Sequence, residues 1–150
     1  MNAFPDTSFL CSLYRKQVYS SRAIEFMDKA RVPLPITTLL LLEFRQSTRL
    51  QSWLYDRDKT RGFSEQEANT TLQHLQSDLS AGVFEMAPVD WPEAHLRAES
   101  LSAKHARQHG HRLTDILHVA TALCLGTKQF LTFDENQRQL AKAEGLEVSI

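Results

Sequence analysis

No apolar stretch of the sequence is long enough to span a membrane. The longest uncharged, apolar-rich segment, residues 32–42, contains two prolines and is far shorter than the ~20 residues that a spanning helix needs. The first residues, MNAFPDTS, have neither a basic leader nor an apolar run, so we expect no export signal. Cys11 and Cys124 lie in apolar helical patterns. Two such cysteines without a secretory signal are typical of reduced thiols in a cytoplasmic protein.

Glycine is also scarce, and its distribution argues against a nucleotide-binding protein with a glycine-rich phosphate loop. The five glycines are scattered, and no nucleotide-binding loop can be formed from them. The formal net charge of −1 likewise argues against a protein held to nucleic acid by its overall field. It leaves room for a local basic patch, and residues 104–112, KHARQHGHR, form one without any acidic residue.

The remaining composition is that of an ordinary globular protein. Of the 150 residues, 42% are hydrophobic and 23% are charged, which excludes disordered and fibrous classes. A chain of this length buries roughly 70% of the surface that its unfolded form exposes. We therefore expect residues 1–150 to form a single domain.

Short strands alternate with helices along the chain. Apolar runs bounded by turn residues predict five strands, at residues 2–5, 34–37, 83–87, 129–133 and 146–149. Helical spacing is found between them, at residues 9–14, 20–30, 38–54, 64–81, 91–108, 113–125 and 135–144. Connections of this length predict an α/β fold with a parallel sheet that helices cover on both faces. In such a sheet the functional crevice lies beyond the carboxyl ends of the strands.

The segment from Arg112 to Asp134 organises the rest of the chain. Its first half is apolar on nearly every face of a helix, which predicts a deeply buried helix. Asp115 opens that helix, and Asp134 closes the strand that follows it. Carboxylates are seldom carried at the ends of buried elements unless a positive group meets them there.

Two further acids are predicted to reach the same crevice. Asp6 follows the first strand and Glu43 comes shortly after the second. Three of the four acids also have a structural explanation: Asp6 and Asp134 are N-cap candidates, and Asp115 complements a helix dipole. Glu43 lacks one, because no cation lies three or four residues away from it. His118, one turn after Asp115, suits a metal pair, but we favour a core histidine.

Four converging carboxylates would repel one another unless a cation neutralised them. Ligands that are all oxygen suit Mg²⁺ or Mn²⁺ better than zinc. Such an ion lowers the pKa of a water and stabilises charge on phosphate oxygens, which is the chemistry of phosphodiester hydrolysis. The sequence therefore predicts a metal-dependent hydrolase without a covalent intermediate.

These segments, taken in order, resemble those of the PIN domain family, in particular its VapC-type toxin ribonucleases. The resemblance rests on DTSFL at residues 6–10, TT at 37–38 with Glu43 five residues later, DILHVATA at 115–122 and LTFD at 131–134. It implies a three-layer α/β/α fold with a five-stranded parallel sheet of order 3-2-1-4-5. It also implies an endoribonuclease that uses Mg²⁺ or Mn²⁺, a homodimer, and inhibition by a cognate antitoxin of a type II toxin–antitoxin pair.

The resemblance assigns roles to particular positions. The metal-site and catalytic acids are Asp6, Glu43, Asp115 and Asp134. Ser8 and Thr132 are hydroxyl neighbours that orient ligands or water, and Asn136 stands where many relatives have a further acid. For RNA we expect contacts from Lys104, Arg107, Arg112 and Arg45, although a solvated helix end also explains the basic stretch.

Two alternatives compete with the enzyme. The first is a PIN-like fold that binds RNA or protein without catalysis, and the presence of all four acids argues against it. The second is a receiver domain, which needs a pair of acids after the first strand and a lysine after the fifth. Asp6 stands alone and the chain ends at LEVSI, so the enzyme is the favoured interpretation.

Overall fold

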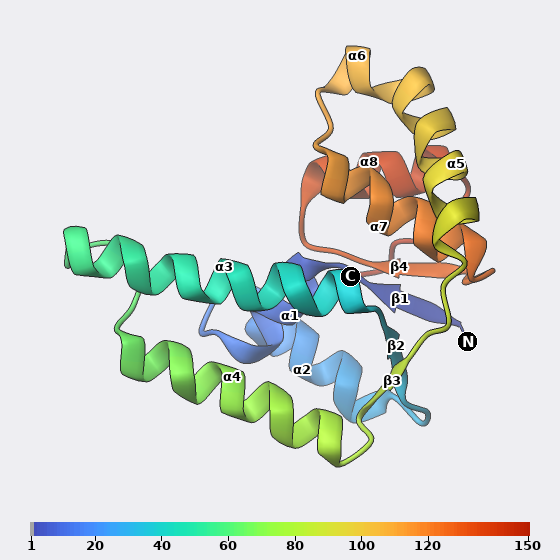
Figure 1. Cartoon of the computed structure of the whole chain (residues 1–150). Coiled ribbons are helices and arrows are strands. Elements are labelled where there is room, and N and C mark those ends of the chain that lie inside the picture. Colours follow the sequence, from blue (N-terminus) through green and yellow to red (C-terminus); the bar gives the residue numbers. More distant parts are fainter. Residues whose placement is uncertain (1) are drawn as a thin grey trace.

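Helices and strands alternate in the computed structural model, which describes residues 2–150 (Figure 1). The strands are β1 (Ala3–Pro5), β2 (Leu34–Ile36), β3 (Phe84–Met86) and β4 (Gln129–Leu131). The helices are α1 (Thr7–Tyr14), α2 (Ser20–Lys29), α3 (Thr38–Arg57), α4 (Glu65–Ser80), α5 (Trp91–Leu101), α6 (Arg107–His109), α7 (Leu113–Cys124) and α8 (Glu135–Ala143), with a π-helical turn, η1 (Ser102–Ala106), between α5 and α6.

The strands are parallel, as predicted, but the prediction of one continuous five-stranded sheet of order 3-2-1-4-5 is wrong. β1 pairs with β4 and β2 pairs with β3, which gives two separate two-stranded ladders within the described chain. The predicted fifth strand, residues 146–149, is reduced to an isolated bridge between Gln129 and Glu147. β1 and β2 lie side by side without a ladder between them.

Prolines explain the break between β1 and β2. Leu34 and Ile36 bond to β3 through their backbone groups, so the backbone of Pro35 between them faces β1. The N–H of Asp6 bonds to β4, so the preceding residue, Pro5, faces β2. Proline has no N–H to donate to a ladder. Both facing edges therefore lack donors where hydrogen bonds would have to form.

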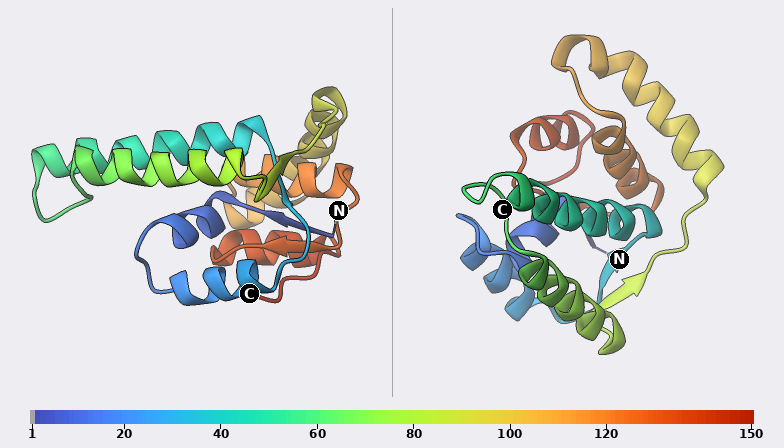
Figure 2. Two further views of the ribbon diagram at one scale, coloured as in Figure 1. Left: turned by 90° about the horizontal axis from the view of Figure 1, so that it is seen from below. Right: turned by 60° about the vertical axis from the view of Figure 1, so that its left-hand side comes forward.

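Helices cover both faces of the strands, which confirms that part of the prediction. On one face, Ala3 and Leu131 pack against α1, α2, α3 and α4. On the other, Phe4 and Phe130 pack against α5, α7 and α8. Side chains alternate between the two cores because successive residues of a strand point to opposite faces. A three-layer α/β arrangement results (Figure 2).

Most helix starts follow the capping signals in the sequence. Thr37 Oγ1 accepts the N–H of Leu40 at 3.1 Å, and Ser64 Oγ accepts that of Glu67 at 3.2 Å. These caps begin α3 and α4, which form an antiparallel pair that reaches well beyond the strands (Figure 2).

The helix predicted at residues 91–108 contains an irregularity that the sequence did not indicate. Its α-helical course is interrupted by η1, and Gly110 ends it in a left-handed conformation, with a φ of 64°. The helix before β4 is buried as predicted along most of its length, yet its first residue, Leu113, is exposed. In the described part of the chain no helix has the length and apolar character needed to cross a membrane.

Candidate functional site

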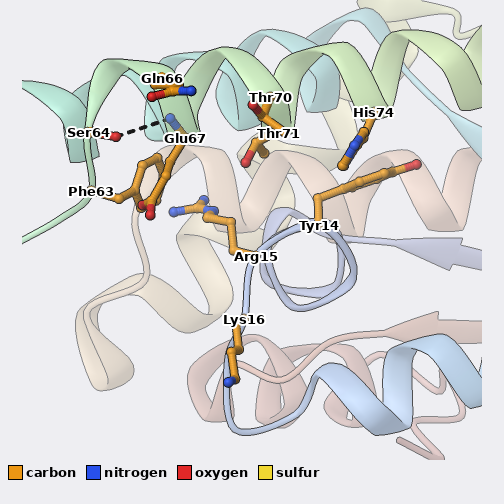
Figure 3. Close-up of a pocket in the computed structure, with 10 residues that line it drawn as sticks. All are labelled: Tyr14, Arg15, Lys16, Phe63, Ser64, Gln66, Glu67, Thr70, Thr71 and His74. Atoms are coloured by element: carbon orange, nitrogen blue, oxygen red, sulfur yellow. Dashed lines mark hydrogen bonds between the residues drawn. The ribbon is translucent and has the colours of Figure 1, made fainter.

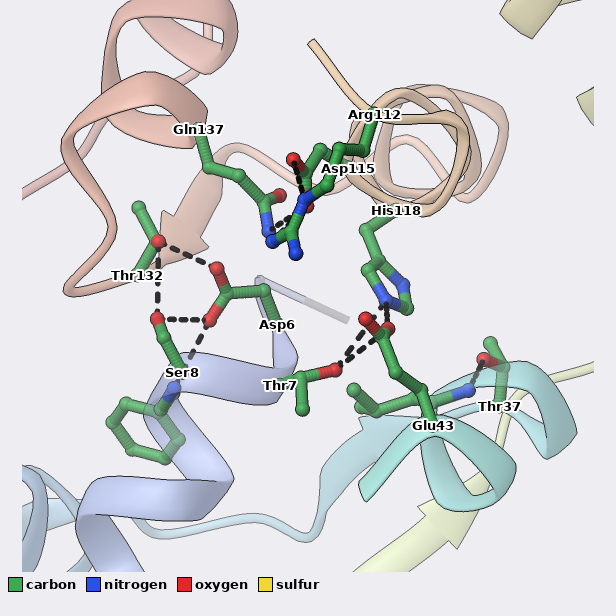
Figure 4. A network of polar contacts seen from close by, with 12 residues as sticks. Asp6, Thr7, Ser8, Thr37, Glu43, Arg112, Asp115, His118, Thr132 and Gln137 are labelled. Carbon is green, nitrogen blue, oxygen red and sulfur yellow. Dashed lines mark hydrogen bonds and ion pairs between the residues drawn. The ribbon is translucent and has the colours of Figure 1, made fainter. Parts of the chain in front are cut away.

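A groove of about 580 Å³ runs along α1 and α3 and past the starts of α7 and α8, beyond the carboxyl ends of β1, β2 and β4. Glu43, Asp115 and Asp134 line this acidic groove. Asp6 lies beneath its floor and is completely buried. The four predicted acids therefore come from four separate segments of chain to one place (Figure 4 shows three of them).

Asp6 is held by three hydrogen bonds. Ser8 Oγ and Thr132 Oγ1 donate to its two carboxylate oxygens at 2.6 and 2.5 Å, and the N–H of Phe9 donates at 3.0 Å (Figure 4). The last of these is the predicted N-cap of α1. Burial raises the pKa of Asp6 to about 6, although the three hydrogen bonds act in the opposite direction. Ser8 and Thr132 are therefore hydroxyl neighbours of an acid, and the acid that they contact is Asp6.

Glu43 finds its partners far away in sequence. Thr7 Oγ1 donates to Glu43 Oε2 at 2.8 Å, and the same oxygen is bonded to Nε2 of His118 (Figure 4). Burial acts to raise the pKa of Glu43, but the contacts with His118 and Thr7 outweigh it and lower the pKa. His118 is buried, as predicted for a core histidine, and it also belongs to the polar network of the site.

Asp115 is buried in the first turn of α7 and has two partners. Arg112 approaches it with Nε at 3.3 Å from Oδ2, while the Arg112 side chain stays 76% exposed. Gln137 Nε2 donates to Asp115 Oδ1 at 3.4 Å (Figure 4). The pKa of Arg112 is raised because the Asp115 carboxylate stabilises its charge. Arg112 thus contributes a cation at the edge of the groove.

Asp134 caps α8. Its Oδ1 accepts the N–H of Gln137 at 2.9 Å, which confirms the N-cap expected from the sequence. Thr132 Oγ1 accepts the N–H of Asp134 at 3.0 Å while donating to Asp6. One hydroxyl therefore connects the first and the last of the four acids.

The chemistry of the groove fits a hard divalent cation. The groove offers carboxylate oxygens as metal ligands. The Gln137 amide lies beside Asp115, and its buried Oε1 has no hydrogen-bond partner. In the arrangement described for residues 2–150, no three His, Cys, Asp or Glu side chains are close enough to share an ion. In this arrangement each carboxylate is bonded within the chain: Glu43 to His118, Asp115 to Arg112, Asp6 to Thr132 and Asp134 to the N–H of Gln137.

Other predicted residues lie elsewhere. Lys104, in η1, bonds Glu144 at 2.8 Å, and Arg107 is exposed on α6. Neither they nor Arg45 are among the groove-lining residues, whereas Arg112 is. Asn136, the expected neutral substitute for a further acid, is exposed on α8 and does not line the groove.

Several groove residues escaped the sequence analysis, among them Thr7, Gln137 and Arg15. Thr7 is adjacent to Asp6, and only the fold brings its hydroxyl to Glu43. Gln137 reads as the last residue of a capping box, but its amide turns to Asp115 instead. Arg15 lies just after α1 and had no motif to identify it.

Comparison with known proteins shows the family of this chain. The sequence model of the PIN domain family matches residues 3–143, nearly the whole chain. The chain belongs to the PIN domain family. The match spans all four acids of the groove, so this PIN domain carries them within the family region. Among curated proteins, none matches the sequence.

Solved structures share the fold of this PIN domain. FitAcB from Neisseria gonorrhoeae matches with a TM-score of 0.66 and 16% identity over 99% of this chain and 96% of its own. VapC20 from Mycobacterium tuberculosis, a toxin that cleaves the sarcin–ricin loop, matches with a TM-score of 0.66 and 16% identity over 97% of both chains. VapBC2 from Rickettsia felis, bound to a promoter DNA fragment, matches with a TM-score of 0.63 and 12% identity over 99% and 98%.

Proposed function

We propose that this PIN domain is a metal-dependent endoribonuclease that hydrolyses RNA phosphodiester bonds with a water nucleophile. One observation carries the proposal: four carboxylates from separate segments meet at one groove, at the carboxyl ends of the strands. Carboxylates gathered in this way need a cation to balance them.

Asp6, Glu43, Asp115 and Asp134 would hold the cation, which we propose to be Mg²⁺ or Mn²⁺. When bound, the ion supplies positive charge for the phosphate oxygens and lowers the pKa of a nearby water. Ser8 and Thr132 keep the carboxylate of Asp6 in position through hydrogen bonds. His118 and Thr7 do the same for Glu43. The chain itself therefore supplies a rigid set of oxygen donors.

Arg112 is placed to bind substrate. It lines the acidic groove, is mostly exposed, and points its guanidinium toward Asp115. Because the side chain is mostly exposed, the N–H groups that do not face Asp115 are available to a phosphate. Arg112 would orient the RNA strand across the acids.

We further propose that the protein is the toxin of a type II toxin–antitoxin pair and acts in the cytoplasm, where RNA is found. The structural likeness to the toxin VapC20 and to VapBC2 supports this assignment, and a cognate antitoxin would then be its protein partner.

A homodimer is proposed from an apolar groove of about 300 Å³ on another face of the molecule. It lies between the start of α3, α5 and α7, and Leu42 on its border is 64% exposed. Its lining is formed by Thr38, Leu39, Leu42, Trp91, His95 and Leu117. An exposed apolar groove on a small domain is typical of a protein interface.

The test is cleavage of a mixed RNA pool by the purified chain with Mg²⁺ or Mn²⁺ and with EDTA. We expect cleavage that requires the metal and disappears in Asp134→Asn. Asp90→Asn is the matched control and should cleave normally, because Asp90 also caps a helix, α5, but does not line the groove. RNA binding without cleavage by folded protein, under every metal condition, would instead favour the non-catalytic binding module.

A further inference from the structure

Arg15 carries a fixed positive charge without a carboxylate partner. Among residues 2–150 no Asp or Glu lies within ion-pair distance of its guanidinium, in contrast to Arg112, Arg97 and Arg138. Its Nη2 donates to Ser47 Oγ at 2.9 Å and contacts the sulfur of Cys11. Its Nε is enclosed and has no hydrogen-bond partner.

The guanidinium is also held in place by aromatic rings. It lies 5.7 Å from the ring centre of Phe44 and 5.8 Å from that of Phe63. Such contacts restrict an arginine without neutralising it, and arginine cannot release its proton. A partly enclosed cation of this kind is stabilised most by an anion that arrives from outside.

Arg15 stands between two hollows. It lines the acidic groove, together with neutral groups such as Ser47 and Gln17. It also lines a neighbouring hollow of about 550 Å³ between the end of α1 and the start of α4 (Figure 3). Lys16 and His74 border this second hollow, and its only lining carboxylate in the described chain, Glu67, stays beyond ion-pair distance of Arg15.

We propose that Arg15 binds a backbone phosphate of the RNA strand at a subsite away from the cleaved bond. The inference rests on the proposed function. Arg112 lines the acidic groove beside the four acids, and Arg15 lines it where it meets the second hollow. Two fixed cations along one path suit a strand with regularly spaced negative charges better than a single acidic side chain of a protein. The strand would leave the acids, pass Arg15 and enter the second hollow.

The decisive experiment measures binding rather than cleavage. RNA oligonucleotides of increasing length are titrated in the Asp134→Asn background with Mn²⁺, so that the RNA stays intact in every sample. In the protein that retains Arg15, the affinity for RNA should rise in a step once the oligonucleotide is long enough to reach this side chain. Arg15→Gln should remove the step, weaken binding of longer RNA by about tenfold, and lower the salt slope by about 0.7.

Arg31→Gln is the matched control. Arg31 is an exposed arginine just before β2, at the opposite end of the strands from the groove, so its loss removes the same charge elsewhere. Arg15→Lys covers the case in which Arg15→Gln fails to fold, because it preserves the charge. It should keep the salt slope while binding more weakly than arginine, since its ammonium cannot match two phosphate oxygens.

Two results would overturn the inference. One is an unchanged length step and salt slope in Arg15→Gln. The other is tighter Mn²⁺ binding by Arg15→Gln with unaltered RNA affinity, which would mean that Arg15 only balances the nearby acids. Either result leaves metal-dependent cleavage by the unmodified chain intact. Absence of both RNA binding and cleavage in the unmodified chain would remove the proposed function and this subsite together.

Discussion

The hydroxyl of Thr132 donates a hydrogen bond of 2.5 Å to Oδ2 of Asp6, across 126 positions of sequence. Oγ1 of Thr132 also accepts the N–H of Asp134 at 3.0 Å. Thr132 is completely buried, so no water replaces it. The two acids at opposite ends of the chain are thus fixed relative to each other by one side chain.

Replacing Thr132 by valine should damage both stability and metal binding. Valine has nearly the same shape but leaves a buried carboxylate oxygen of Asp6 without its donor. We expect the free energy of unfolding to fall by about 2 kcal/mol and the thermal midpoint to fall by roughly 4 to 8 °C. Thr132→Ser keeps the hydroxyl and should lose much less. Equal midpoints for the valine and serine variants would contradict the role of this hydrogen bond.

The metal-free protein should lose stability as the pH rises from about 4 to 6. The pKa of Asp6 is about 6 in the folded state against an ordinary value of 3.8, because burial disfavours its charge. The contribution of Asp6 to the free energy of unfolding is therefore fully present below pH 3.8, where its carboxyl group is protonated in both states. It is lost as the pH rises through 6. The loss should amount to about 3 kcal/mol at most.

Asp6→Asn isolates this effect, because asparagine does not titrate. Chemical denaturation of both proteins at several pH values, without metal, should show a downward slope in the unmodified chain that the variant lacks. Added Mn²⁺ should reverse the loss above pH 6 in the unmodified chain only. Parallel pH curves for the two proteins would contradict the assignment to Asp6.

Arg112→Gln should separate metal binding from substrate binding. Arg112 and a metal ion compete for the carboxylate of Asp115, so removal of the arginine should tighten Mn²⁺ binding. Because the Arg112 side chain is 76% exposed, a gain of up to about fivefold is expected. RNA affinity should fall in the same variant. Titrations with Mn²⁺ and with RNA test this, and weaker Mn²⁺ binding would show that Arg112 supports the site rather than competing for it.

Leu42→Glu should prevent the proposed homodimer. Leu42 borders the apolar groove between α3, α5 and α7, and a charge there cannot be buried against a second copy. Leu96→Glu is the control, because Leu96 is 68% exposed but does not line that groove. Light scattering should report twice the chain mass for the unmodified protein and the control. The same mass for Leu42→Glu and the control would argue against this interface.

The sequence predicted the local positions of Asp6 and Asp134 well, because the place of a residue after a strand and before a helix is local information. Asp6 and Asp134 each follow a strand and cap a helix, as expected. The sheet was predicted less well, since the consequence of Pro5 and Pro35 depends on which edge of a strand each proline faces. Pattern alone indicates that a proline is present and does not indicate its partner strand.

Contacts over long sequence distances were beyond the sequence analysis. His118 was predicted to be buried, but its bond to Glu43 exists only because α3 and α7 approach each other across the strands. Arg15, at the end of α1, and Gln137, on α8, also reach the groove through contacts between segments far apart in sequence. In contrast, Lys104 looked like an RNA contact from its basic neighbours, and the fold pairs it with Glu144.

The most direct test of the account is Mn²⁺ binding by the unmodified chain and by Asp115→Asn, measured calorimetrically together with RNA cleavage. Asparagine keeps the shape of Asp115 and its contact with Gln137, so the variant should fold normally. The account predicts a defined Mn²⁺ site in the unmodified chain, weaker binding in the variant, and loss of cleavage. Equal Mn²⁺ affinity and undiminished cleavage by Asp115→Asn would contradict it.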